Sequence, residues 1–145
     1  MNFFDAIHSS ASGLTAQRIR MNLISSNLAN AQTTKTIDGG PYRRKLAVFE
    51  TKPIERDFSK VLQNEVEKNP SQVKVSEIVD DKRQPILKYD PMHPDANADG
   101  FVAMPNINVI EEMTDMLSAS RSYEANVTAI TTTKAMVQKA LEIGK

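Results

Sequence analysis

The sequence predicts an α+β fold in which two long helices, one at each end of the chain, enclose a small β-rich lobe. Hydrophobic residues recur every seven positions near both termini, and β-branched runs separated by glycine and proline lie between them. A seven-residue repeat keeps one apolar stripe facing a partner helix. We therefore expect an antiparallel coiled coil, with residues 1–36 as the first helix region, 37–104 as the β lobe and 105–145 as the second helix region.

Two rows of apolar side chains define the predicted helix seam. The N-terminal row is Ile7, Leu14, Met21 and Leu28. The C-terminal row is Val109, Met116, Tyr123, Ile130 and Val137, joined by Met113, Val127 and Leu141. Such stripes bury apolar surface between helices and carry no chemistry, so the pattern indicates assembly rather than catalysis.

The first predicted helix, residues 1 to about 31, has an unusual polar surface. Its only charged residues are Asp5, Arg18 and Arg20, and serine, threonine and asparagine fill most other outward positions. Each of these small polar residues is less favourable in a helix than alanine by about 0.5 kcal/mol. We therefore expect this segment to be weakly ordered alone and to become helical when it packs into something larger.

The second predicted helix, residues 105–143, has a clearer start. Pro105 precedes Asn108, which is placed as an N-cap with Glu111 three residues later. Acidic residues near this end complement the positive helix N-terminus, and Gly144 occupies the position where a helix often ends. This helix is expected to be the template on which the first one orders.

The middle of the chain contains three strand candidates, at residues 42–51, 73–79 and 85–89. The second and third are separated by the polar connection Asp80–Arg83, which has the length of a hairpin loop. Between the first and second, apolar residues within 58–66 fit one face of a short helix. We expect a small β lobe, too short for an enzyme domain of the usual size.

Composition excludes several classes of function. The 145 residues contain no cysteine and have a formal net charge of zero, so disulfides, thiolate catalysis, zinc ribbons and a nucleic-acid footprint are not expected. The basic cluster Arg43–Lys45 is interpreted as a solvated strand face. No run approaches the roughly 20 apolar residues that span a bilayer, and the first residues do not form a leader. Export, if it occurs, is expected to need no cleaved signal peptide.

One segment, Asp95–Gly100, matches the opening of a calcium loop. Position 12 of such a loop needs a glutamate but holds Asn106, and no helix is expected on either side, so the segment is better explained as a turn. His93 and His8 lack the neighbouring ligands of a metal site and are interpreted as structural. We assign no catalytic, cofactor or metal site. A small calcium-binding protein and a soluble coiled-coil adaptor stay open as alternatives.

Segments 13–18 and 26–31 resemble the N-terminal motif of the bacterial flagellar axial proteins, the rod, hook and hook-associated subunits. Segments 100–109 and 118–127 are similar to the subunits of the proximal rod. The residues that carry this resemblance are Asn27, Leu28, Ala29, Asn30, Pro105, Asn106, Asn108, Ser120, Arg121, Tyr123 and Asn126.

The resemblance implies a structural subunit of the flagellar basal body that is not an enzyme and holds no cofactor. Members of this family self-assemble into a hollow helical drive shaft that crosses the periplasm and transmits torque from the motor to the hook. The expected partners are further copies of the chain, other proximal-rod subunits, the ring-to-rod adaptor protein and the flagellar type III export apparatus. Nucleic acid and direct membrane insertion are not expected.

Overall fold

The computed structural model describes residues 3–37, 39–53 and 71–143. These residues form two long helices and four strands in an α+β arrangement, as the sequence predicts. The elements are α1 (Phe3–Ala29), β1 (Lys45–Pro53), β2 (Ser71–Asp80), β3 (Ile86–Tyr89), β4 (Phe101–Met104) and α3 (Val109–Ile143). The short helix expected within residues 58–66 lies outside the described residues.

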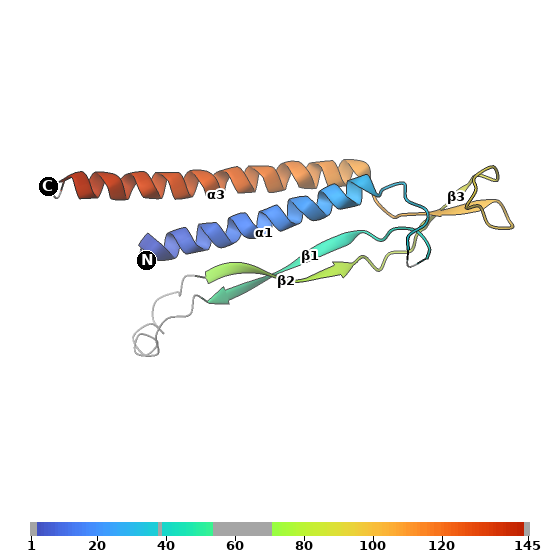
Figure 1. Cartoon of the computed structure of the whole chain (residues 1–145), viewed down its shortest axis with the longest axis horizontal. Coiled ribbons are helices and arrows are strands. Elements are labelled where there is room, and N and C mark those ends of the chain that lie inside the picture. Colours follow the sequence, from blue (N-terminus) through green and yellow to red (C-terminus); the bar gives the residue numbers. More distant parts are fainter. Residues whose placement is uncertain (1–2, 38, 54–70, 144–145) are drawn as a thin grey trace.

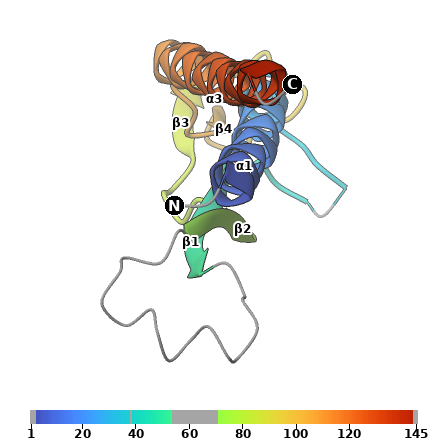
Figure 2. The same ribbon diagram turned by 90° about the vertical axis from the view of Figure 1, so that its left-hand side faces the viewer.

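The elements lie in three layers, with α1 in the middle. α3 packs along one side of α1, and the β1–β2 ribbon packs along the other (Figures 1 and 2). The helices run in opposite directions, because Arg20 of α1 meets Asp115 of α3 while Asn27, later in α1, meets the earlier residue Glu112. A helix with protein on two sides has little surface for solvated charges, which accounts for the charge-poor sequence of α1.

The strands pair differently from the prediction. The expected hairpin between the second and third strands is wrong: β2 pairs with β1, from Lys45↔Asp80 to Pro53↔Ser71, with a bulge between Val48 and Phe49. β3 pairs instead with β4, a four-residue strand that the sequence reading missed. The nine residue pairs between β1 and β2 favour this pairing more than the short connection Asp80–Arg83 favours a hairpin of β2 with β3. The two sheets are separate, and β3–β4 extends beyond the end of the helices (Figure 1).

The ends of the helices follow from local hydrogen bonding. Asn108 is the N-cap of α3, as predicted, because its Oδ1 accepts from the N–H groups of Ile110 at 3.1 Å and Glu111 at 3.5 Å. Pro105 lies before the helix, so α3 begins four residues later than the predicted start. At the end of α1, the Asn30 side chain donates to the carbonyl of Ser26 at 2.9 Å. Gly144 lies outside the described residues.

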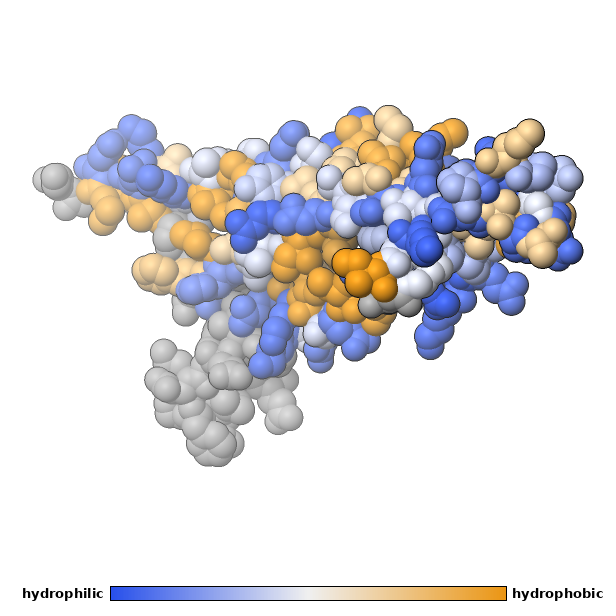
Figure 3. All heavy atoms as spheres, turned by 45° about the vertical axis from the view of Figure 1, so that its right-hand side comes forward, coloured by the Kyte–Doolittle hydropathy of each residue, from blue (hydrophilic) through white to orange (hydrophobic). Residues whose placement is uncertain are grey.

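Very little of the described chain forms a core. The buried hydrophobic residues are Ala16, Ile24, Val102 and Ala119, and the buried polar ones are Asp5, Asn27 and Glu112. Every helix and strand has large apolar side chains at the surface, for example Ile110, Met113 and Leu117 on α3. Figure 3 shows apolar atoms exposed along the length of the molecule. The subunit therefore leaves much of its hydrophobic surface uncovered.

Candidate functional site

The most elaborate set of contacts joins α1, α3 and the start of β1. We call this set the junction and define it as Arg20, Asn27, Tyr42, Arg44, Glu112 and Asp115. Two members, Asn27 and Glu112, are each 1% exposed. Polar side chains are seldom buried to this degree unless they are fully hydrogen-bonded. The junction is therefore the point at which the position of three elements is fixed.

Asn27 uses both its donor and its acceptor atoms. Its Oδ1 accepts from the N–H of Lys45 at 2.9 Å and from the hydroxyl of Tyr42 at 3.1 Å. Its Nδ2 donates to the carbonyl of Lys45 at 3.0 Å and to Glu112 Oε2 at 3.1 Å. The side-chain amide thus pairs with the peptide groups of β1 much as a neighbouring strand would, while also holding α3.

Glu112 forms a buried ion pair with Arg44. Arg44 Nε donates to Glu112 Oε1 at 2.5 Å, and the Arg44 side chain is only 11% exposed. The same guanidinium reaches Asp115 at 3.4 Å, and Arg20 of α1 donates to the other oxygen of Asp115 at 3.0 Å. A buried charge that loses its partner is strongly destabilising, whereas an intact and hydrogen-bonded pair is tolerated. The carboxylates of α3 consequently hold two arginines from different parts of the chain.

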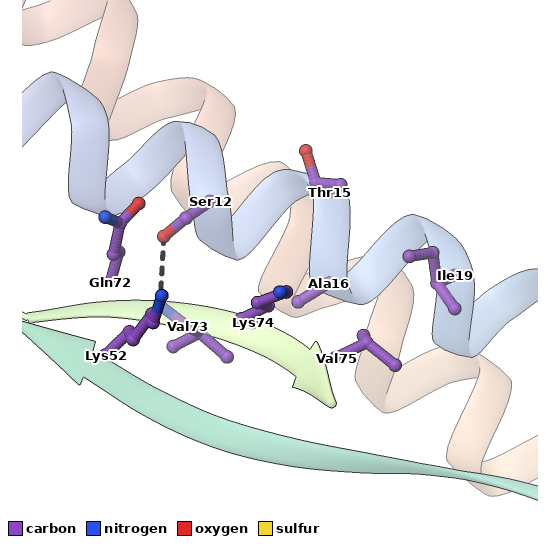
Figure 4. Close-up of a pocket in the computed structure, with 9 residues that line it drawn as sticks. All are labelled: Ser12, Thr15, Ala16, Ile19, Lys52, Gln72, Val73, Lys74 and Val75. Atoms are coloured by element: carbon purple, nitrogen blue, oxygen red, sulfur yellow. Dashed lines mark hydrogen bonds between the residues drawn. The ribbon is translucent and has the colours of Figure 1, made fainter. Parts of the chain in front are cut away.

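A second, simpler set of bonds joins the other end of α1 to β2. The hydroxyl of Ser12 accepts from the N–H of Val73 at 3.1 Å (Figure 4). The hydroxyl of Ser9 donates to the carbonyl of Ser71 at 3.1 Å. Serines three positions apart lie on one face of a helix, so they can follow the edge of a strand. These bonds are solvent-exposed, unlike those of Asn27. They give the serine-rich face of α1 a structural role.

Next to these serines, α1 and the ribbon enclose an open groove of about 450 Å³. Its walls include Ala16 and Ile19 from α1 and Val73 and Val75 from β2, with Lys74 also lining it (Figure 4). The lining is mainly apolar, and it carries no cluster of ionisable groups suited to catalysis.

The structure separates the predicted seam residues into two groups. Those that are half-buried are Ile7, Leu14, Met21, Leu28, Met116, Tyr123, Ile130 and Val137. Those that are exposed in the subunit are Val109 (44%), Met113 (58%), Val127 (38%) and Leu141 (68%). The role of either group in assembly stays a prediction, and the exposed group has no covering element within the described chain.

Close contacts between α1 and α3 also come from small and polar residues that lie outside the predicted apolar seam. Gly13 lies against Asn126: a Cβ at Gly13 would come within 3.1 Å of the amide nitrogen of Asn126. Ala119 of α3 is fully buried. Gly13, Arg20 and Asn27 share a seven-residue spacing, as do Glu112, Ala119 and Asn126. This spacing was available in the sequence, but a search for apolar residues alone passes over it.

The segment considered as a calcium loop is a turn in the structure. Asn97 Oδ1 accepts from the N–H groups of Asp99 at 3.1 Å and Phe101 at 2.8 Å, and Gly100 has a positive φ of 78°. Asp95 accepts from the hydroxyl of Thr34 at 2.8 Å. Within the described ranges no three His, Cys, Asp or Glu residues are grouped so that they could hold a metal. The calcium-binding alternative therefore has no support.

Among the ionisable groups of the described chain, the carboxyl of Asp81, directly after β2, has a lowered pKa. A hydrogen bond from the backbone N–H of Arg83 lowers the pKa of this carboxyl below 3.8, with the Arg83 guanidinium adding to the effect and desolvation opposing it. Asp81 also anchors the ribbon through its own N–H, which donates to the carbonyl of Arg44 at 2.7 Å. The shift reflects a local turn and carries no catalytic implication.

Comparison with known proteins gives matches at both ends and over the whole length. The family model of the flagella basal body rod protein matches residues 7–35. The family model of the C-terminal region of flagellar basal body rod FlgEFG proteins matches residues 98–143. The Bacillus subtilis flagellar basal-body rod protein FlgC is 48% identical, with 100% of each chain covered.

The Borreliella burgdorferi flagellar basal-body rod protein FlgC is 43% identical over 99% of this chain and 98% of the relative. The chain belongs to the FlgC family of flagellar basal-body rod proteins. An Escherichia coli FlgC is 39% identical over 100% of this chain and 98% of its own. The chain is accordingly a structural subunit of the flagellar basal-body rod, as the sequence resemblance implies.

Four of the residues that carried the resemblance to this family bond at helix ends or where elements meet. Asn27 is the centre of the junction, Asn30 and Asn108 bond at helix ends, and Asn106 donates to the carbonyl of Gln84 at 3.0 Å. Asn126 donates to the carbonyl of Ser122 at 2.9 Å. Of the others, Pro105 is buried, Leu28, Ser120 and Tyr123 are half-buried, and Ala29 and Arg121 are exposed.

None of the helices in the described part of the chain is long and apolar enough to cross a membrane. The FlgC relatives are named flagellar basal-body rod proteins.

Proposed function

We propose that this FlgC-family subunit polymerises with copies of itself and with other proximal-rod subunits into a hollow helical drive shaft that transmits torque from the motor to the hook. In this proposal α1 and α3 form an antiparallel coiled-coil core, and residues 37–104 form a lobe outside it. The observation that carries it is the exposed apolar row of α3, which includes Met113, Val127 and Leu141 at 58%, 38% and 68% exposure. Exposed apolar surface of this extent marks a contact with other protein.

The internal contacts of the chain support the same proposal. The buried hydrophobic residues of the described chain are few, so apolar burial within one subunit contributes little stability. Stacking many subunits would bury the remaining apolar side chains and add a contact area at each interface. A shaft under torque needs many such contacts and no chemistry. We therefore also propose that the subunit is not an enzyme.

The proposed location is the rod across the periplasm, reached through the flagellar type III export apparatus without a cleaved signal peptide. The ring-to-rod adaptor protein is the further proposed partner. These points rest on the membership of the FlgC family.

The test substitutes an apolar residue that is exposed in the subunit. Val127→Asp should leave the circular dichroism spectrum of the purified subunit nearly unchanged, because the new charge is solvated there. In cells the same substitution should abolish swimming and remove the subunit from purified basal bodies, because assembly would bury an unpaired charge. Swimming plates and immunoblots of basal bodies measure both.

A matched control is Thr132→Asp, an exposed position on the same helix in a polar row. It adds the same charge and a similar helix-propensity cost but should leave swimming intact. Normal assembly of the Val127→Asp subunit would show that the exposed row of α3 is not an assembly surface.

A further inference from the structure

We propose that the groove between α1 and β2 receives the protruding end of α3 from a second copy of this chain. The inference rests on the proposed polymerisation and assigns a site to one contact in it. The groove has apolar walls, and the end of α3 is apolar and uncovered. Each feature lacks a covering element in the described part of its own subunit, and their chemistry is complementary.

The groove is already partly formed in the isolated subunit. Ser12 of α1 is bonded to the backbone of Val73 at one end, so the helix and the strand lie side by side there. Beyond this bond, Ala16 and Ile19 face Val75 across an open space of about 450 Å³ (Figure 4). An apolar groove that is already present in the subunit receives an amphipathic helix at a lower ordering cost than one that must form on binding.

The end of α3 projects beyond the rest of the subunit and can enter a groove on another copy. Because Gly13 lies against Asn126 and the helices are antiparallel, the last turns of α3 run past the start of α1 (Figure 1). In these turns Met136 is 61% exposed, Leu141 is 68% exposed and Ile143 is 85% exposed. A projecting helix with three large exposed apolar side chains requires a hydrophobic receptor in the assembled state.

Charge favours the same pairing. The C-terminal end of a helix carries partial negative charge from its unpaired carbonyl groups. The last turn of α3 contains no basic residue, and the Glu142 carboxylate in it is paired with Lys139 Nζ at 2.7 Å. Lys74 lines the groove and brings a cation to the receiving side. The partial negative charge of the terminal carbonyl groups therefore suits an apolar groove edged by lysine.

The end of α3 and the groove cannot meet within one subunit. α3 packs on one side of α1, and the groove opens between α1 and the ribbon on the other side (Figure 2). A contact between two different surfaces of identical chains is head-to-tail, and it generates an open helical filament when its rotation does not close a ring. The proposed contact therefore extends along a rod instead of ending at a dimer.

The experiment uses the absence of cysteine from the chain. Cells expressing the double variant Ile19→Cys with Leu141→Cys, beside a wild-type copy that maintains assembly, are treated with a mild oxidant. Purified basal bodies are then analysed on non-reducing gels. We expect disulfide-linked multimers of this chain, and mass spectrometry should identify the joined peptides as those containing positions 19 and 141.

The control pair is Lys82→Cys with Leu141→Cys, since Lys82 is exposed in the connection after β2 and lies outside the groove. The groove pair should give several-fold more cross-linked product than this control. Double-variant subunits that are present in basal bodies but give no product above the control would overturn the inference and leave rod assembly intact. Absence of wild-type subunits from basal bodies would instead contradict the proposed function.

If the double variant is excluded from basal bodies while the wild type enters, a second pair, Val75→Cys with Met136→Cys, decides the case. Linked peptides from this pair support the inference. No linked peptides, or adducts of either position with a different rod subunit, overturn it.

Discussion

The two ends of α1 are attached to the rest of the subunit in contrasting ways. Near Asn27 the helix is tied to β1 and α3 by buried bonds, and one of them leads to a buried ion pair. Near Ser9 and Ser12 its hydrogen bonds to β2 are two exposed hydroxyl bonds. A hydrogen bond withdrawn from water is costly to lose, whereas an exposed one is readily replaced by solvent.

This contrast indicates a gradient of order along one helix. The end near Asn27 is held in place by contacts within its own subunit. The bonds of Ser9 and Ser12 to β2 are exposed to water, and the sequence predicts that the helix gains order on assembly. The gradient makes that expectation more specific, because it assigns the dependence on neighbours to the N-terminal half.

The largest effect should come from breaking the junction at Glu112. The change Glu112→Ala leaves Arg44 largely buried without its closest carboxylate, which should cost roughly 3–5 kcal/mol of the free energy of unfolding. Urea denaturation of the purified subunit measures this cost. Glu124→Ala, at an exposed position of the same helix, should change stability by no more than about 0.5 kcal/mol. Equal effects of the two changes would remove the contrast between the ends of α1.

A smaller effect is expected for Asn27→Ala. It deletes the partner of both peptide groups of Lys45 and of Glu112, at a cost of about 2–4 kcal/mol if each lost bond contributes about 1 kcal/mol. Thermal unfolding followed by circular dichroism reports the change. The matched variant Asn22→Ala, exposed on the same helix, should be neutral or slightly stabilising, since alanine is the better helix former. A stable Asn27→Ala protein would mean that the junction does not hold the layers together.

The smallest effect concerns Ser12→Ala. The lost bond to Val73 is offset by the better helix propensity of alanine, so the free energy of unfolding should change by less than about 1 kcal/mol. The local readout is amide hydrogen exchange at Val73, which should become faster. Ser25→Ala, at an exposed position near the other end of α1, should leave that amide unchanged. Unaltered exchange at Val73 in the Ser12→Ala subunit would argue against attachment by serine.

Local patterns in the sequence were sufficient to predict both helices and three of the four strands. The N-cap at Asn108 was predictable because capping acts within one turn. Strand pairing was not, because the nearest connection in sequence, Asp80–Arg83, joins two separate sheets. The β4 strand was missed because a run of four residues is too short to show the alternation that marks a strand.

The candidate site was only partly predictable for a related reason. Asn27 stood out through the family resemblance, but its partner Glu112 is 85 residues away, and Arg44 lies 68 residues from Glu112. Contacts between residues so far apart produce no regular spacing in the sequence. The apolar rows directed attention to Met113 and Val127, although the residues just before them, Glu112 and Asn126, contact α1.

The way in which Asn27 holds β1 bears on how the sequence can change. Its amide pairs with the N–H and the carbonyl of residue 45 and makes no use of the lysine side chain, which is exposed. Any residue other than proline offers the same two groups. This contact therefore allows many different residues at position 45, whereas position 27 needs a side-chain amide that both donates and accepts. Residue 45 can adapt to a changing neighbour without loosening its own subunit.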